Sequence, residues 1–321
     1  MADISAPTLY YKFDDGSGTS AAEGMGTGLA LTASGGAIWA PGKIGPYSTE
    51  IDQGTANYWS RASHASLNIG SSDWTIAMWV NLLDDPAAGS ATIVAKNAAY
   101  SNYYWAVKYS KGSDQFYIEL ISFDGVAVRS NQFTATPTYV PGDGWVHIVF
   151  ALENTGSAIS GKWYINGVDG GTVRTTSGLD ITTQSLDNTN PFYVARYNAA
   201  GGGYMDGYLD ELRLYKGVLF DQTDAQDLYE WDSAEIIITS DPSNQIIMDG
   251  ETGVFSITAT GAVDIYYQWY ESSWTGAGLT GTTGYSPMIG ETGPSLYLTG
   301  VTGLQNRNRY LCAADDTLIL T

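Results

Sequence analysis

The segment from Gly203 to Tyr229 constrains the fold of this chain most strongly. It begins with glycines, continues as an alternating strand and ends in the only convincing short helix of the sequence. For that helix we predict Thr223 as the N-cap, with Gln226 completing a capping box. Strict alternation would divide the strand between two faces, with Leu209, Glu211, Arg213 and Tyr215 on one and Asp210, Leu212 and Leu214 on the other.

Short alternating segments recur before this point, and their spacing predicts an all-β fold with many turns. In SLNIGSSDWTIAMWV (66–80), alternation places Trp74, Ile76, Met78 and Val80 opposite Thr75, Ala77 and Trp79. The segments ATIVAK (91–96), YYWAVKY (103–109) and QFYIELIS (115–122) continue this pattern as a meander. Asn166-Gly167 is the strongest local hairpin signal. The 38 glycines suit a chain with so many turns.

Four motifs resemble those of laminin-G-like, concanavalin-type lectin domains. WTIAMWV (74–80) is similar to the FTISFWVK core strand of that family, and GWVHIVFAL (144–152) to its WHHVAVTY strand. GKWYINGVDG (161–170) resembles its LYVNG hairpin, and the 203–229 segment resembles its closing strand and helix. The resemblance covers about residues 6–232 in the right order. It implies a concanavalin-like jelly-roll sandwich, which we assign to residues 1–233.

The remaining residues, 234–321, resemble a smaller immunoglobulin-like β-sandwich. An alternating strand around Phe255 and Ile257 is followed by YYQWY (266–270), SLYLTGV (295–301) and RYLCAA (309–314). In that family pattern Trp269 is the core tryptophan and Tyr310 the tyrosine-corner residue. The sequence departs from the pattern because the first of the two usual core cysteines is missing, and Phe255 or Ile257 takes its place.

Charge and cysteine content exclude several classes of function. The 14 basic and 34 acidic residues give a net charge of −20, which would repel a nucleic-acid backbone. Cys312 is the only cysteine, so no disulfide can form within the chain. No apolar run reaches transmembrane length, which argues against membrane insertion. The N-terminus lacks the features of a secretory signal, so we expect synthesis in a cytoplasm.

Catalytic side chains are scarce, and we predict that the protein is not an enzyme. His147 lies inside an apolar strand and is expected to pack in the core, whereas His64 lies in a polar loop. Glycoside hydrolases with concanavalin-type folds use a closely spaced Glu-x-Asp-x-x-Glu strand, and this sequence has no such motif. No cofactor is expected to be required.

A structural calcium ion is the one cofactor that the sequence leaves open. Related lectin-like sandwiches often hold calcium between an early loop and the last strand, and here Asp14, Asp15 and Asp210 are the matching carboxylates. The alternative, slightly favoured, is that Asp210 caps backbone amides of a loop. Asp14 and Asp15 are then ordinary turn residues in contact with solvent.

Candidate glycan-binding residues are aromatic and amide side chains in two loops, since sugars stack on exposed rings. They are Tyr100, Asn102 and Tyr103 in the first loop, and Tyr197, Asn198 and Tyr204 in the second. The alternative is that such rings pack the core and its edges, which we expect for Tyr104 and Trp105.

Two recognition folds without disulfides look like a phage virion protein, such as a capsid decoration, head fibre or tail-associated adhesin. We therefore expect a particle-surface protein that contacts capsid or tail proteins and binds cell-surface polysaccharide. The alternatives are a structural cement protein without a glycan, and a bacterial surface or extracellular carbohydrate-binding protein. A homo-oligomer stays open, because no coiled-coil heptads are present to drive one.

Overall fold

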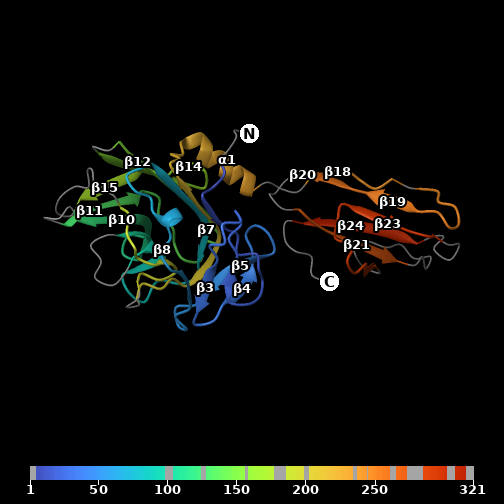
Figure 1. Ribbon diagram of the computed structural model, residues 1–321, viewed down its shortest axis with the longest axis horizontal. Helices are drawn as coiled ribbons and strands as arrows, with labels where there is room; N and C mark the ends of the chain where they lie inside the picture. The colour runs from blue at the N-terminus through green and yellow to red at the C-terminus, as the bar shows by residue number, and fades with distance from the viewer. Residues whose placement is uncertain are drawn as a thin grey trace. The chain divides into compact units, whose positions relative to one another are not determined.

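The computed structural model describes residues 5–97, 104–123, 128–155, 158–176, 186–198, 202–233, 237–243, 245–260, 265–272, 285–301 and 308–315. The chain divides into two compact units: unit 1 comprises Met1–Lys43 and Tyr47–Glu230, and unit 2 comprises Ile44–Pro46 and Trp231–Thr321. Strands dominate both units (Figure 1). The predicted all-β fold is confirmed, and unit 1 forms a sandwich of two sheets as predicted. No helix in the described part of the chain is both long enough and apolar enough to cross a membrane.

Unit 1 consists of two antiparallel sheets that enclose a common core. Sheet A runs in the spatial order β14 (Val168–Asp169), β13 (Ile159–Ile165), β12 (Val146–Asn154), β7 (Trp74–Leu82), β17 (Gly207–Lys216), β5 (Tyr47–Ile51) and β4 (Ile38–Pro41), with β1 (Leu9–Tyr11) also paired to β17. Sheet B runs in the order β15 (Thr172–Thr176), β11 (Val128–Ala135), β10 (Gln115–Phe123), β9 (Tyr104–Ser110), β8 (Ser90–Lys96), β16 (Phe192–Val194), β6 (Tyr58–Arg61), β3 (Leu31–Ser34) and β2 (Ser20–Ala21). A short 3-10 helix, η1 (Ala65–Leu67), precedes β7, and its N-cap is the exposed His64, whose Nδ1 accepts from Ser66 N.

The core of unit 1 follows the alternation of its strands. Trp74 and Met78 on β7 point between the sheets, toward residues such as Trp105 on β9. The other face of sheet A is covered by helix α1 (Gln222–Asp232), whose Ala225 and Leu228 pack against this face (Figure 1). Full burial of one large apolar side chain stabilises a domain by about 1.5–3 kcal/mol. Because the side chains of β7 alternate between the two faces, this strand contributes apolar contacts to both faces of sheet A.

The hairpin predicted at Asn166-Gly167 is confirmed. These two residues have φ angles of 49° and 75°, and they join β13 to β14 with Ile165 paired to Val168. Positive φ at both turn residues matches the twist of the flanking strands, which explains why Asn-Gly forms this turn so readily. The hairpin therefore closes one edge of sheet A.

The strict alternation predicted for β17 is wrong because the strand contains a β-bulge. The register against β7 shifts between Asp210 and Arg213, and Glu211 has a φ angle of 53°. One extra residue reverses the faces of all later side chains. As a result Leu209, Leu212 and Leu214 all lie in the same core.

The predicted N-cap of α1 is also wrong, by two residues. Asp221 caps the helix: its Oδ1 accepts from Thr223 N at 2.7 Å and from Asp224 N at 3.1 Å. Asp224 completes the capping box, since its Oδ2 accepts from Asp221 N at 3.0 Å. An aspartate is a stronger N-cap than a threonine and also favours the positive end of the helix dipole.

The described residues of unit 2 form three small antiparallel sheets. They join β18 (Ile237–Ser240) to β20 (Thr258–Thr260), β19 (Gly253–Ser256) to β23 (Ser295–Leu298), and β21 (Tyr266–Ser272) to both β22 (Ser286–Pro287) and β24 (Arg309–Asp315). Trp269 is fully buried beside Ile257, Leu296 and Cys312, and its Nε1 donates to Gly293 O at 2.9 Å. Burial raises the pKa of the free Cys312 thiol to about 11, which makes the thiol unreactive at neutral pH.

Candidate functional site

The predicted glycan-binding residues fall into two groups in the structure. Tyr100, Asn102 and Tyr103 lie outside the described residues. The others follow β16: Tyr197 and Tyr204 are half-buried, whereas Asn198 is buried. Gly203 O accepts from Thr92 N at 2.6 Å, which attaches this segment to β8. Of the described predicted residues, Tyr197 has contacts that connect it to a larger site.

Tyr197 lies on the outer face of sheet B, the face that points away from the core. Its ring is perpendicular to the ring of Tyr104, with 5.7 Å between the ring centres. Lys108 Nζ lies 4.1 Å from the centre of the Tyr197 ring and forms a 2.9 Å ion pair with Glu119. The same ammonium group lies 5.9 Å from the centre of the Tyr117 ring. Lys108 therefore connects the predicted Tyr197 to a tyrosine that sequence analysis did not select.

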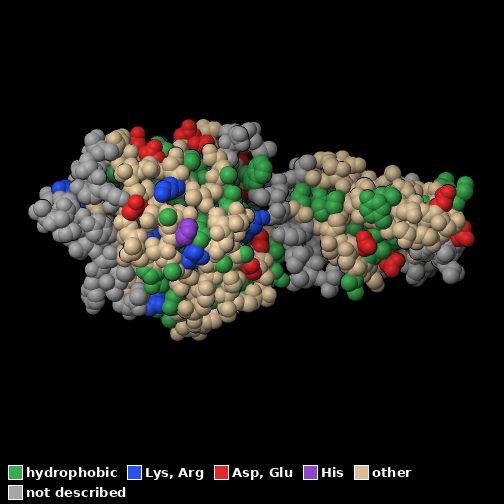
Figure 2. Space-filling model, viewed as in Figure 1, with side chains coloured by type: hydrophobic (Ala, Val, Ile, Leu, Met, Phe, Trp, Pro, Cys, Tyr) green, Lys and Arg blue, Asp and Glu red, His purple; other side chains and the backbone are tan. Residues whose placement is uncertain are grey.

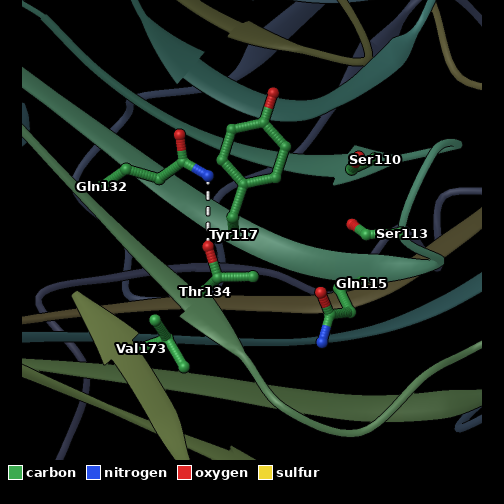
Figure 3. Close-up of a pocket in the computed structure, with 7 residues that line it drawn as sticks. All are labelled: Ser110, Ser113, Gln115, Tyr117, Gln132, Thr134 and Val173. Atoms are coloured by element: carbon green, nitrogen blue, oxygen red, sulfur yellow. Dashed lines mark hydrogen bonds between the residues drawn. The ribbon is translucent and has the colours of Figure 1, made fainter. Parts of the chain in front are cut away.

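Tyr117 belongs to a polar hollow of about 460 Å³ on this outer face. Figure 3 shows its ring between serines at the end of β9 and amide and hydroxyl groups on β11. Gln132 Nε2 donates to Thr134 Oγ1 at 3.1 Å, and Gln115 Nε2 donates to Thr136 O at 3.0 Å. We call this site the polar hollow, and its lining residues are Ser110, Ser113, Gln115, Tyr117, Gln132, Thr134 and Val173.

Strand register brings these side chains together. Tyr117 pairs with Lys108 on β9 and with Thr134 on β11, and Thr134 pairs with Val173 on β15. Directly opposed residues on antiparallel strands share a face of the sheet. The signal that sequence analysis missed is alternation in QFYIELIS, where Gln115, Tyr117 and Glu119 point away from the buried Phe116, Ile118 and Leu120.

On this face the charges of Lys108 and Glu119 offset each other. Burial lowers the pKa of Lys108, but attraction to Glu119 outweighs it and the net shift is upward, so the ion pair persists at neutral pH. Burial raises the pKa of Tyr104 far above its usual value, and the Glu119 carboxylate adds to that increase. The polar hollow itself is lined by uncharged groups. It can exchange hydrogen bonds with hydroxyl groups without attracting a net charge.

The three candidate calcium ligands are not gathered into one site. Asp15 accepts from Ala22 N at 3.0 Å, and Asp14 accepts from Tyr47 N at 3.3 Å. Asp210 is buried and accepts from Lys43 N at 2.8 Å and from Glu211 N at 2.9 Å. Within the described residues no group of three metal-binding side chains is present. Each of these carboxylates thus binds at least one backbone amide, and a calcium site formed by them stays a prediction.

Other buried carboxylates are committed to the fold in the same way. Glu23 accepts from the backbone amides of Tyr10, Met25 and Thr27. Burial raises the pKa of Glu23, but these hydrogen bonds outweigh burial and lower the pKa overall. Glu211 is paired with Arg213 and Tyr10. Neither carboxylate is arranged as the acid or the nucleophile of a glycoside hydrolase.

The two histidines also lie away from the polar hollow. His147 is fully buried, with its ring centre 5.1 Å from that of Trp79 and 6.0 Å from that of Tyr229, as expected for a packed core residue. His64 is exposed and caps η1. On the face that Figure 2 shows, the basic side chains of the described residues lie scattered among other types.

Several of the solved structures that are similar to this chain are toxin binding domains. The binding domain of Paraclostridial Mosquitocidal Protein 1 matches with a TM-score of 0.54 and 13% identity, covering 82% of this chain and 57% of that one. The botulinum neurotoxin serotype G binding domain matches with a TM-score of 0.50 and 13% identity, covering 84% and 60%. The chain thus spans less than two thirds of either domain.

The binding domain of botulinum neurotoxin DC, solved in complex with SialylT, matches with a TM-score of 0.51 and 11% identity, covering 90% of this chain and 70% of that one. Identities this low establish similarity of fold. No curated protein matches the sequence. The model of the family described as the concanavalin A-like lectin/glucanases superfamily, Laminin_G_3, matches residues 53–223. That match covers more than half of the sequence, and the chain belongs to this family.

Proposed function

We propose that the protein is a non-catalytic carbohydrate-binding module and that the outer face of sheet B binds the saccharide. The observation that carries this proposal is the polar hollow, in which the Tyr117 ring is surrounded by amide and hydroxyl side chains. A tyrosine ring can stack on the apolar C–H face of a pyranose, and the surrounding groups can bind its hydroxyls. The neutral lining and the net charge of −20 favour an uncharged saccharide.

The contacts around the polar hollow support a preformed site. Lys108 is held between two tyrosine rings by its ion pair with Glu119, so these side chains lose little freedom when a ligand arrives. Tyr197 extends the same face beyond Lys108. A linear saccharide could therefore contact Tyr117 and Tyr197 in succession. Three similar solved structures are toxin binding domains, and one of them was solved with SialylT, which is consistent with this class of function.

The test is a glycan array with the whole protein, followed by titration of the best ligand into variants. We expect Tyr117→Ala to weaken binding about tenfold, the loss of about 1.4 kcal/mol expected from removing one stacked ring. Tyr297→Ala is the matched control, because Tyr297 is 62% exposed on β23 of unit 2. Equal binding by both variants would place the saccharide elsewhere. An array repeated in EDTA tests the calcium prediction, and we expect unchanged binding.

For residues 234–321 we propose the immunoglobulin-like fold. Support comes from the pairing of β19 with β23 and of β21 with β24, around the buried Trp269 and Cys312. Two β-modules without a disulfide suit display on a phage particle, which we propose as the setting, with capsid or tail proteins as partners. A mass-spectrometric inventory of purified particles that lacked this chain would refute the virion setting. Cement protein and bacterial surface lectin are the alternatives in that case.

A further inference from the structure

A second hollow lies in unit 1, beside the turns that lead into β12 and out of β13. Its volume is about 310 Å³, at the lower end of the range for small-molecule sites. The side chains that matter for its chemistry are Phe116, Tyr139, Asp143, Trp145, Ile165 and Asn166. We call it the end pocket. It shares no lining residue with the polar hollow, since Phe116 and its neighbour Tyr117 point to opposite faces of sheet B.

Backbone hydrogen bonds hold the wall of the end pocket in place. The Tyr139 hydroxyl accepts from Leu82 N at 3.0 Å and donates to Gly144 O at 2.7 Å. Gly142 N donates to Leu82 O at 2.8 Å. The ring of Tyr139 also packs on Phe116, with 5.3 Å between ring centres. A wall fixed in this way reduces the entropy that a ligand must remove on binding.

Among the described residues, two polar side chains in the end pocket each form a hydrogen bond with the protein through only one of their two polar atoms. Asp143 Oδ2 accepts from Val140 N at 2.9 Å, and Asn166 Oδ1 accepts from His147 N at 2.9 Å. Their other atoms, Asp143 Oδ1 and Asn166 Nδ2, have no hydrogen-bond partner in the described part of the chain. The first is an acceptor and the second a donor. The half-buried Trp145 lies in the same pocket and offers a flat apolar surface.

From this arrangement we propose that the end pocket binds one neutral pyranose, separately from the polar hollow. Adjacent ring hydroxyls of a pyranose can donate to Asp143 and accept from Asn166, while its C–H face stacks on Trp145. Among the described residues that line the end pocket there is no lysine, arginine or histidine, and Asp143 would repel a sugar carboxylate. The pocket therefore selects an uncharged sugar over a uronic or sialic acid.

The test uses saturation-transfer NMR on the whole protein with neutral methyl pyranosides and with methyl glucuronide as the anionic comparison. Asn166→Asp is the principal variant. It keeps an oxygen for His147 N and a residue type that tolerates the φ angle of 49°, but it removes the donor. Trp145→Ala removes the stacking surface. Tyr117→Ala serves as the control for the polar hollow.

We expect a neutral pyranoside to bind the wild type and Tyr117→Ala, and to bind Asn166→Asp and Trp145→Ala at least about tenfold more weakly. Melting temperatures identify any variant that fails to fold. If Trp145→Ala fails to fold, the test of the end pocket rests on Asn166→Asp. The proposal is overturned if no pyranoside binds, if binding survives both end-pocket variants, or if methyl glucuronide binds equally well. Loss of binding in Tyr117→Ala alone would support the polar hollow and overturn the end pocket.

Discussion

Breaking the buried ion pair between Glu211 and Arg213 should destabilise unit 1 more than any change at the proposed binding sites. The side chains of these residues are 1% and 5% exposed. Arg213 Nη2 also donates to the Tyr10 hydroxyl at 3.0 Å, and the guanidinium carbon lies 4.6 Å from the centre of the Tyr10 ring. Glu211→Gln keeps the shape of the side chain but removes the carboxylate charge that pairs with the buried Arg213.

Removing one partner of a buried ion pair typically costs about 3–5 kcal/mol. For a domain of this size 1 kcal/mol lowers the melting temperature by about 2–4 °C, so Glu211→Gln should lower it by roughly 6–20 °C. Arg213→Met should also destabilise, because it removes the guanidinium charge that pairs with the buried Glu211 carboxylate. The double variant removes both charges, so its cost should be smaller than the sum of the two single costs by about 1–3 kcal/mol.

The assay is calorimetric unfolding of the whole protein, since the chain forms two compact units that can unfold in separate transitions. A transition that responds to Trp269→Ala, a fully buried residue of unit 2, identifies that unit and should not move in the ion-pair variants. Single variants that each cost less than about 1 kcal/mol would refute this account. So would a double variant whose cost equals the sum of the two single costs.

Three further predictions concern unit 1. Burial lowers the pKa of Lys96 to about 8, so between that pH and the ordinary pKa of lysine the unfolded chain binds more protons than the folded one. The free energy of unfolding of the wild type should therefore rise by about 2 kcal/mol relative to that of Lys96→Met between about pH 7.5 and about pH 9.5. Urea titrations that show no such difference would contradict the shift. Asp210→Ala should lower the free energy of unfolding in urea by about 2–4 kcal/mol, equally in EDTA and in calcium, because two backbone amides lose their acceptor. A loss of stability seen only in calcium would instead indicate a metal site. Gly207→Ala should yield little folded protein by circular dichroism, since Gly207 has a φ angle of 144° and a Cβ there would lie 2.0 Å from Asn81 O. Gly89→Ala is the control, because a Cβ at Gly89 meets open space and its φ angle is not positive.

Local patterns were enough to predict much of unit 1. Alternation on β7 identified the inward-facing side chains, and Asn166-Gly167 identified the hairpin, because each depends on neighbours along the chain. Burial of His147 was likewise predictable from its apolar strand, whereas burial of Trp269 in unit 2 was predicted from the resemblance to an immunoglobulin-like domain. The order of strand motifs indicated the concanavalin-like fold, and the family match confirms it.

Only the tertiary structure decided where faces reverse and which distant residues meet. The bulge at Glu211 depends on how β17 pairs with β7, and a pattern of strict alternation does not predict where an extra residue is inserted. The polar hollow joins Tyr117, Gln132 and Val173 from three strands whose register is set by the packing of the whole sheet. The same three-dimensional arrangement directs Asp14, Asp15 and Asp210 to different backbone amides, because a carboxylate near an unpaired amide satisfies that amide first.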